Sequence, residues 1–313
     1  MGDLTTTTLG RTGLEVTQLG YGAMELRGAP RGRAVDATDA GRVLNAVLDA
    51  GINFIDTSPD YGMSEELIGE HISARRDEFF LASKCGCLVD PPPREPGQVI
   101  PPHEFTPENI RAGVEQSLRR MRTDHLDLVQ FHISPSRETL EEHGAVEALQ
   151  ELRDEGKTRF IGMSGTLPNL TDHIAMGVFD AFQIPYSALE REHEASITAA
   201  AAAGAGTIIR GGVARGAPEK PADAFAQFPE RMREALERRR DRWSDANLDD
   251  LLDGMTRMEF MLRFTLTHPA LHTTIVGTSN VDHLAANVEA AAKGPLPREQ
   301  YDAATARLAA FEG

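Results

Sequence analysis

An aspartate, a tyrosine, a lysine and a histidine stand where three successive apolar stretches of the chain end. Asp56 and Tyr61 follow the stretch GINFI, Lys84 closes EFFLASK, and His132 closes HLDLVQFH. A carboxylate gains nothing from a buried strand, so Asp56 is predicted to have a chemical role. The alternative is that Asp56 caps the next helix, but that helix is expected to begin nearer Ser64.

These four side chains together predict proton transfer to or from a small oxygen atom. A tyrosine phenol has an ordinary pKa of about 10, which is too high for efficient proton exchange near neutral pH. A neighbouring lysine ammonium lowers that pKa, and an aspartate would keep the lysine charged and oriented. The histidine could donate a hydrogen bond to a carbonyl oxygen. Because side chains cannot supply hydride, carbonyl reduction at this site would need a nicotinamide or a flavin.

The elements that must position these residues follow an alternating pattern. Strands are expected at 16–24, 53–58, 78–84, 125–132, 158–165, 179–187, 205–212 and 272–279. Helical segments are expected between them at 36–51, 64–74, 106–121, 144–156, 168–176 and 196–204, in part of the stretch before 269, and at 280–294. Eight such units favour a closed α/β barrel of the (β/α)8 type, the TIM barrel, over an open sheet. A barrel would also bring Ser164, Gln183 and Arg210 to the same rim.

Three further segments add to the predicted barrel. The stretch TTTTLGRTGLEVT predicts an N-terminal β-hairpin that turns at Gly10–Gly13 and plugs the barrel floor. Residues 87–105 follow strand 3 and residues 217–245 follow strand 7, and both are longer than ordinary loops. We expect these two segments to project over the carboxyl rim and to shape substrate choice. Residues 1–313 are expected to form a single domain.

Composition limits the classes of partner. The chain of 313 residues has a formal net charge of −16, which disfavours nucleic acid and anionic membrane surfaces. With no apolar run of about 18 residues and no visible signal peptide, a cytoplasmic protein is expected, as a monomer or small homo-oligomer. Cys85 and Cys87 are expected to be reduced structural thiols. Cys-Gly-Cys without further ligand spacing predicts no metal site.

The motifs also occur in a familiar order. GINFIDTSPDYGMSEELIG, LASK, SLRRMRTDHLDLVQFH, RFIGMSG, FQIPY, GTIIRGGVARG and TIVGTSNVDHLAANV resemble the successive motifs of the aldo-keto reductase superfamily, from about residue 4 to residue 292. The resemblance implies a (β/α)8 barrel that reduces aldehydes and ketones with NADPH, less often NADH. It implies cofactor binding without a Rossmann fold, which agrees with the lack of a G-x-G-x-x-G between a strand and a helix.

The resemblance also implies roles for individual residues. Tyr61 would be the general acid, Lys84 would lower its pKa, Asp56 would pair with Lys84, and His132 would orient the substrate. Contacts to the cofactor are implied for Gly22, Ala23, Met24, Asp56, Ser164, Gly165, Gln183, Arg210, Gly211, Gly212, Val213, Gly216, Gly277, Thr278, Ser279, His283 and Asn287. Within this set, Ser164 and Gln183 would bind the carboxamide, and Asn287 would reach the adenine. The pyrophosphate and the adenosine phosphate would be bound by the backbone from Gly211 to Gly216 and by the start of the last helix around Gly277, Thr278 and Ser279.

Three departures from the family pattern bear on cofactor choice. Gly165 stands where the family commonly has asparagine, Arg210 where an aromatic residue often stacks on nicotinamide, and His283 where NADP-specific members carry arginine. The resemblance implies NADPH as the cofactor, and these departures leave NADH possible.

Two other functions stay open at this point. One is a nicotinamide-binding regulatory subunit of the same superfamily with little turnover. The other is an unrelated barrel, an isomerase or lyase that binds a phosphorylated substrate at strands 7 and 8. Consumption of reduced nicotinamide with simple aldehydes would distinguish an enzyme of the predicted class from both.

Overall fold

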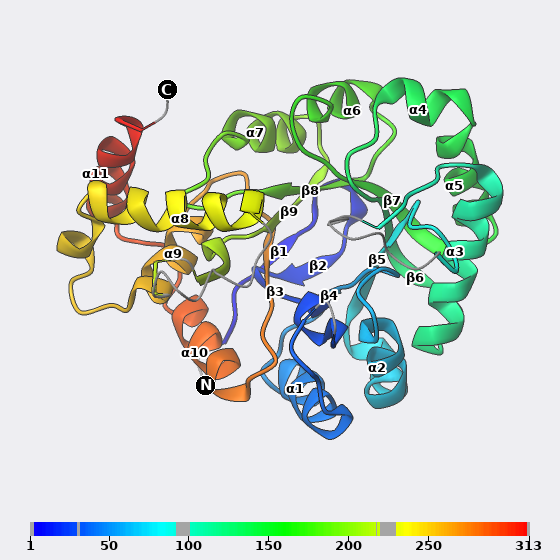
Figure 1. Ribbon diagram of the computed structural model, residues 1–313, viewed down its shortest axis with the longest axis horizontal. Helices are drawn as coiled ribbons and strands as arrows, with labels where there is room; N and C mark the ends of the chain where they lie inside the picture. Colours follow the sequence, from blue (N-terminus) through cyan, green and yellow to red (C-terminus); the bar gives the residue numbers. More distant parts are fainter. Residues whose placement is uncertain (1–2, 30–31, 92–100, 217, 220–229, 312–313) are drawn as a thin grey trace.

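Eight parallel strands close into a barrel at the centre of the computed structural model, which describes residues 3–29, 32–91, 101–216, 218–219 and 230–311 (Figure 1). The barrel strands are β3 (Leu19–Gly22), β4 (Phe54–Asp56), β5 (Phe80–Cys85), β6 (Leu126–Phe131), β7 (Thr158–Ser164), β8 (Ala181–Pro185), β9 (Gly206–Arg210) and β10 (Thr273–Val276). They neighbour one another in chain order, and β10 closes the ring by pairing with both β9 and β3. The predicted (β/α)8 barrel is confirmed.

An antiparallel hairpin covers the amino end of the barrel. It consists of β1 (Thr6–Thr8) and β2 (Glu15–Thr17), joined by a turn in which Gly13 has a φ of 70°. Its side chains Leu9 and Leu14 pack in one buried cluster with Phe54 of β4. The predicted hairpin is therefore confirmed, and in Figure 1 it lies across the centre of the ring.

The single strand predicted at 16–24 is wrong in its extent, because two strands share that stretch. β2 ends at Thr17 and β3 begins at Leu19. Asn53, which lies far along the chain, stabilises the break between β2 and β3. Its side chain accepts a hydrogen bond from Thr17 N at 2.7 Å and donates one to Glu15 O at 2.8 Å. Only Gln18 separates β2 from β3, so the local pattern alone indicates one strand.

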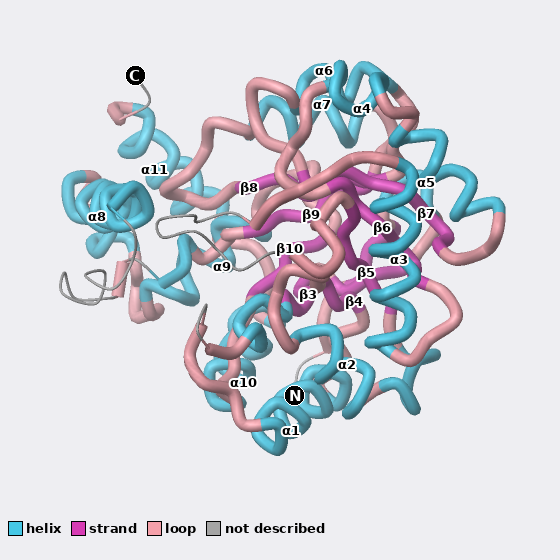
Figure 2. The backbone as a smooth tube through the Cα atoms, turned by 45° about the vertical axis from the view of Figure 1, so that its right-hand side comes forward, coloured by secondary structure: helices cyan, strands magenta, loops and turns pink. Residues whose placement is uncertain are grey.

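Helices surround the barrel on all sides (Figure 2). Those that connect successive barrel strands are α1 (Ala37–Asp49), α2 (Ser64–His71), α3 (Pro107–Met121), α5 (Ala145–Asp154), α6 (Leu170–Met176), α7 (Glu194–Ala202) and α9 (Arg257–Leu266), and α10 (Val281–Ala292) follows the last strand. Side chains cap several of their first turns: Asp36, Thr106, Thr256 and Asn280 each accept backbone N–H bonds at the start of a helix. None of the helices in the described part of the chain has the length and apolarity that a membrane crossing requires.

Two helices go beyond the predicted pattern, and a third lies in the stretch before 269 that is expected to be partly helical. α4 (Arg137–Glu142) precedes α5, and α11 (Arg298–Ala309) follows α10. α8 (Glu230–Asp245) occupies the end of the long segment after β9, and it lies with α9 and α11 on one side of the barrel (Figure 1). The expectations for residues 92–100, 217 and 220–229 fall outside the described residues.

The barrel interior changes from apolar to polar along the strand direction. Side chains two residues apart point to the same side of a strand, so a strand that contributes an inward residue to one layer contributes the second residue after it to a later layer. The apolar layer next to the hairpin contains Phe54, Ala82, Leu128 and Ala181. Two residues further along the same strands come Asp56, Lys84, Gln130 and Gln183, all of them buried. The fold thus delivers a polar layer to the carboxyl ends of the strands.

Candidate functional site

Asp56 is the centre of a buried hydrogen-bond network. Its Oδ1 accepts bonds from Gln130 Nε2 at 2.9 Å and from Gln183 Nε2 at 2.8 Å. Both carboxylate oxygens accept from Lys84 Nζ, at 2.9 Å and 2.7 Å. In the described part of the chain, the start of α2 has no side-chain cap hydrogen bond, so the alternative that Asp56 caps this helix has no support. Three strands, β5, β6 and β8, therefore hold one charge in place.

Lys84 is a fully buried ammonium, paired with Asp56 and also donating to the backbone oxygen of Thr57 at 2.8 Å. Burial by itself lowers the pKa of a lysine, because it penalises the charged form. Here the charge of Asp56 and the phenol of Tyr61 outweigh that effect, and the pKa of Lys84 lies above its ordinary value. The lysine is thus held as a cation under the site.

Tyr61 lies in the loop between β4 and α2, where its backbone N–H bonds to Ser58 O at 3.0 Å in a tight turn. Lys84 Nζ is 5.4 Å from the centre of the Tyr61 ring. Burial raises the pKa of Tyr61, and the positive charge of Lys84 acts in the opposite direction. The net pKa lies above the ordinary value, because burial outweighs the lysine. Sequence reasoning anticipated the effect of Lys84 but not the larger effect of burial.

His132 directly follows β6 and reaches the same place. Its backbone N–H bonds to Cys85 O at 3.1 Å, which continues the β5–β6 pairing by one residue. Its ring meets that of Tyr61 edge-on, with centres 6.1 Å apart. The four residues singled out as proton-transfer groups are therefore brought together at the carboxyl rim.

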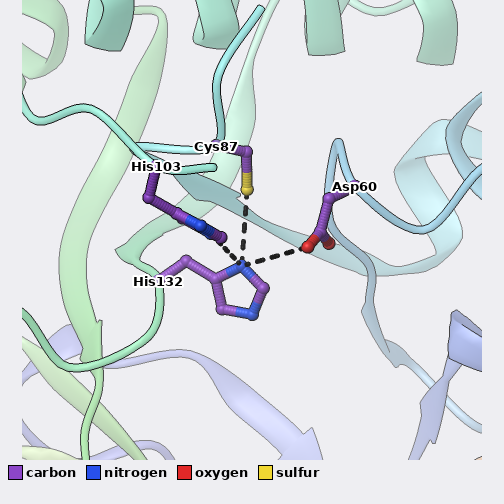
Figure 3. Close-up of side chains that lie close together, drawn as sticks. All are labelled: Asp60, Cys87, His103 and His132. Carbon is purple, nitrogen blue, oxygen red and sulfur yellow. Dashed lines mark hydrogen bonds and ion pairs between the residues drawn. The ribbon is translucent and has the colours of Figure 1, made fainter. Parts of the chain in front are cut away.

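The Nδ1 atom of His132 faces a second group of polar side chains (Figure 3). It lies 3.3 Å from Cys87 Sγ, 3.2 Å from His103 Nε2 and 3.9 Å from Asp60 Oδ2. Burial raises the pKa of the Cys87 thiol. Cys85 and Cys87 are both free and buried, as predicted.

The residues expected to meet a nicotinamide ring stand on adjoining strand ends. Ser164 Oγ donates to Gln183 Oε1 at 3.3 Å, and Ser164 and Gln183 are register partners between β7 and β8. Arg210 ends β9, where burial lowers its pKa, and its Nε is buried without a partner in the described structure. A cofactor amide or ring beside these groups fits such an unsatisfied donor.

Local packing explains why a glycine stands at position 165, which is one of the departures from the family pattern. A Cβ atom added there would lie 2.8 Å from Leu170 Cδ1 and 3.3 Å from Met163 Cγ. The family's asparagine would therefore need Leu170 to move. The backbone N–H of Gly165 instead bonds to Gln183 O at 3.0 Å.

Glycine backbone forms the rim where phosphates are expected. A Cβ on Gly277 would approach Gly22 O to 2.6 Å, so β3 and β10 end in close contact that only glycine permits. Gly211 has a φ of 75°, which also favours glycine. Such bare backbone next to a helix start is the type of cradle that an extended phosphate linkage needs.

Two backbone amides in the first turn of α10 already donate hydrogen bonds to the capping residue Asn280. Asn280 Oδ1 accepts from Asp282 N at 2.7 Å and from His283 N at 3.4 Å. His283 is exposed, and Asn287 stands one turn later, so both lie on the same side of α10. Thr278 is fixed from β3, because Tyr21 Oη donates to its backbone oxygen at 2.7 Å.

The other residues expected near the cofactor flank these groups. Ala23 and Met24 begin the 3₁₀ turn Ala23–Arg27 directly after β3. Gly212 and Val213 follow β9, Gly216 ends the turn Ala214–Gly216, and Ser279 precedes the cap of α10. All of them follow barrel strands on the side of the carboxyl rim.

Sequence reasoning missed Gln130, Asp60, Cys87 and His103. Gln130 gives a usable signal, because it stands two residues before His132 in an otherwise apolar strand, where a buried amide needs a partner. The other three are distant in sequence, and only the folded loops join them.

Comparisons with known proteins agree with this geometry. Residues 18–308 match the sequence model described as the aldo/keto reductase family. The chain is 28% identical over 303 residues, 94% of each chain, to an uncharacterized oxidoreductase YqkF of Bacillus subtilis. It is 28% identical, over 90% of this chain and 91% of the relative, to a D-threo-aldose 1-dehydrogenase of a Pseudomonas species. The solved holo form of aldo-keto reductase AKR11C1 from Bacillus halodurans superposes with a TM-score of 0.80 at 28% identity, covering 97% of this chain and 96% of that one.

Proposed function

Because the chain belongs to the aldo/keto reductase family of oxidoreductases, we propose that it reduces an aldehyde or ketone to an alcohol with a nicotinamide cofactor. The observation that carries the proposal is the convergence of Tyr61, His132 and the buried Lys84–Asp56 pair at one rim. A bound reduced nicotinamide would supply the hydride. The side chains described here manage the proton and the orientation.

Tyr61 is the proton donor in this proposal. Its raised pKa keeps the phenol protonated near neutral pH, so a proton is available when negative charge develops on the carbonyl oxygen. Lys84 favours the phenolate that remains, because its charge lowers the pKa of Tyr61. His132 turns its Nδ1 toward Cys87 and His103, which leaves Nε2 on the opposite edge of the ring to bind the substrate oxygen (Figure 3).

We propose that NADPH is the preferred cofactor and that NADH is accepted. His283 and Asn287 share one side of α10, and the helix start favours an anion. Histidine offers one donor at a time, whereas arginine offers a bidentate fork to phosphate. Asn280 already occupies two amides of the first turn. The extra phosphate of NADPH therefore gains less here than it would beside an arginine.

A polar, sugar-like carbonyl compound is the proposed substrate class. The surroundings of Tyr61 and His132 are polar and charged, since Asp60, His103 and Arg210 lie near them. Aromatic residues make up only 6% of the chain. One relative that matches over most of its length is named a dehydrogenase of D-threo-aldoses, a class with several hydroxyl groups.

The test is consumption of NADPH and NADH with a panel of carbonyl compounds that ranges from aldoses to aromatic aldehydes. We expect turnover with both cofactors, faster with NADPH, and greatest for the polar carbonyl compounds. Nicotinamide binding without turnover on any member of the panel would contradict the proposal and favour a regulatory subunit. Preference for aromatic aldehydes would contradict the substrate class alone.

A further inference from the structure

Four side chains of different chemical types converge beside the proposed proton-transfer site. Asp60 follows β4, Cys87 and His103 belong to the segment between β5 and α3, and His132 follows β6. A carboxylate oxygen of Asp60, Cys87 Sγ, and one ring nitrogen of each histidine all lie within 4.8 Å of one another. In Figure 3 the lines from Asp60, Cys87 and His103 converge on His132 Nδ1.

We propose that Asp60, Cys87, His103 and His132 bind one zinc-type divalent transition-metal ion. Zinc binds thiolate, imidazole and carboxylate at bond lengths that place neighbouring ligand atoms about 3.3–3.7 Å apart in a tetrahedron. The distances from His132 Nδ1 are 3.3 Å to Cys87 Sγ, 3.2 Å to His103 Nε2 and 3.9 Å to Asp60 Oδ2. All four ligand atoms lie within 4.8 Å of one another, so the more distant pairs would have to approach by up to about 1 Å to complete the coordination. With four protein ligands the ion would position His132 and would not contact the substrate.

Charge and ligand type select the ion. One thiolate and one carboxylate carry two negative charges, which balance a divalent cation with two neutral imidazoles. On binding, the Cys87 thiol gives its proton to solvent and forms the metal–sulfur bond, since a coordinating thiol is deprotonated. Sulfur and nitrogen ligands favour zinc and similar metals, whereas magnesium and calcium prefer oxygen.

Groups behind the ligands already hold them in orientations suited to a metal. His103 Nδ1 is 2.7 Å from Pro101 O, and a carbonyl can only accept, so Nδ1 carries the proton and Nε2 presents its lone pair. A hydrogen bond of this kind from the second ring nitrogen is the usual support of a metal-bound histidine. Ser58 Oγ likewise donates to Asp60 Oδ1 at 2.8 Å, which leaves Oδ2 toward the cluster.

The backbone explains why Cys87 and His103 meet. The two residues face each other in an isolated antiparallel bridge. Leu88 N bonds to Pro102 O at 3.1 Å and Glu104 N to Gly86 O at 2.8 Å on either side of that bridge. Facing side chains of an antiparallel pair lie on the same side, so the neck of the segment presents both ligands together. A cavity of about 70 Å³, lined in part by Pro59, Asp60, Cys87 and Leu88, adjoins the ligands.

An ion at this place would decide the tautomer of His132. Two imidazole lone pairs 3.2 Å apart repel, so without an ion His132 Nδ1 would donate its proton to His103 Nε2. His132 Nε2 would then lack a proton and could not donate to a carbonyl oxygen. A metal on Nδ1 moves the proton to Nε2 and makes it a donor. This consequence rests on the function proposed above, whereas the metal site itself does not.

The first experiment measures the metal directly. The full chain, purified without chelators or an affinity tag that binds metal, is tested for zinc by elemental analysis and titrated with Zn²⁺ after chelator treatment. We expect one zinc ion per chain and release of protons on binding. Replacement by Co²⁺ should give the visible bands of tetrahedral cobalt and a thiolate charge-transfer band. Failure of the chain to bind Zn²⁺, or a cobalt spectrum without thiolate, would overturn the proposal.

The second experiment compares ligand variants with matched controls. Cys87→Ser and His103→Gln should weaken zinc binding by more than about 100-fold, the upper effect of losing a supporting residue alone. Cys85→Ala removes the other buried cysteine, and His143→Gln removes an exposed histidine outside the cluster. Both controls should bind zinc as the wild type does. Equal zinc affinity in Cys87→Ser would overturn the assignment, and if a ligand variant does not fold, the thiolate band of wild-type cobalt protein decides.

Activity then separates the two proposals. If the tautomer of His132 depends on the ion, zinc-depleted wild type and His103→Gln should both lose carbonyl reduction while nicotinamide affinity stays unchanged. Restored turnover on adding Zn²⁺ to the wild type, but not to His103→Gln, supports the positioning role. Zinc bound at full stoichiometry in a chain that reduces no carbonyl compound would contradict the proposed function and leave the metal site intact.

Discussion

Asp56 carries the one carboxylate that accepts hydrogen bonds from Lys84, Gln130 and Gln183 together. A buried charge that is paired and hydrogen-bonded in this way stays fixed, so the ammonium above it cannot turn toward solvent. Single side chains at this site therefore act through fixed positions, and substitutions that keep the shape of a side chain test its chemistry alone.

Tyr61→Phe removes only the phenolic oxygen. We expect carbonyl reduction to fall by about 10²–10⁴-fold, the usual contribution of a general acid, with nicotinamide affinity nearly unchanged. Turnover and quenching of protein fluorescence by the cofactor measure the two properties. Retention of most of the activity would remove Tyr61 from its role.

Lys84→Met tests the pH dependence. Reduction needs the protonated phenol, so activity should be steady near neutral pH and decline only where pH exceeds the pKa of Tyr61, which burial raises above the ordinary value. The charge of Lys84 lowers that pKa, so its loss should move the alkaline decline of kcat/KM to higher pH and also reduce the rate. Lys157→Met removes a lysine paired with Glu115 outside the site and should leave the profile unchanged. An unmoved profile in Lys84→Met would show that this lysine does not tune Tyr61.

His283→Arg tests cofactor choice. An arginine on the exposed start of α10 offers a charged fork to the additional phosphate of NADPH. We expect the ratio of kcat/KM for NADPH over NADH to rise by about 10- to 150-fold, since a charged hydrogen bond contributes about 1.5–3 kcal/mol. Ala285→Arg adds the same charge on the opposite side of the helix and should change the ratio little. Equal ratios in both variants would make His283 a bystander.

Among the elements, the N-terminal hairpin is held against the barrel by close backbone contact. A Cβ on Gly10 would lie 2.3 Å from Gly206 N, whereas a Cβ on Gly13 has nothing within 4 Å. Both glycines have positive φ, so both alanine variants pay about 1–2 kcal/mol of backbone strain. We expect Gly10→Ala to lose a further 1–3 kcal/mol or so of unfolding free energy, because backbone must shift. Urea denaturation of the two variants measures the difference, and equal losses would show that the hairpin does not press on β9.

The sequence predicts most elements because their signals are local. Continuous apolar runs mark the barrel strands, and the eightfold alternation with helices marks the closure. The break between β2 and β3 has no local signal, since it depends on Asn53, which lies far along the chain. α11 is not predicted from the sequence for another reason. It buries only Tyr301, Ala304 and Leu308, and these are too few apolar residues to give a strong helical pattern.

The candidate site likewise contains residues that the sequence predicts and residues that it does not. Asp56, Lys84 and His132 can be found from sequence because each ends an apolar strand, and a barrel brings strand ends together. The cluster around His132 Nδ1 cannot, because Cys87 and His103 stand 45 and 29 residues before His132, with no ligand spacing. Their meeting depends on how one loop neck pairs with itself, which no periodic pattern records.

For the molecule as a whole, buried histidines set the response to acid. Burial lowers the pKa of His173, His193, His268 and His272 below the ordinary 6.5. The unfolded chain then binds protons first, so these groups leave the unfolding free energy unchanged above about pH 6.5 and lower it as pH drops from 6.5 toward their folded pKa values. Each histidine costs about 1.4 kcal/mol for every pH unit between its unfolded and folded pKa.

His173 provides the test of this prediction, because its Nδ1 is buried without a partner in the described structure while its Nε2 bonds to Pro135 O. His173→Gln removes one titrating group and should flatten the decline in urea-measured stability between pH 7 and pH 5. His143→Gln, at an exposed position, should leave that decline as it is. A decline of the same slope in both variants would show that His173 does not contribute to it.

The pairing of β3 with β10 determines when the barrel can close during protein synthesis. In this pairing Thr274 faces Leu19 and Val276 faces Tyr21, so the two strands meet across about 255 residues of chain. A ribosome releases the N-terminal strands first, and no growing chain can form the ring before Val276 has emerged. Until then β3 keeps an unpaired edge, and such an edge invites pairing with other chains. The last barrel strand to be synthesised is therefore the one that covers the open edge of the first barrel strand.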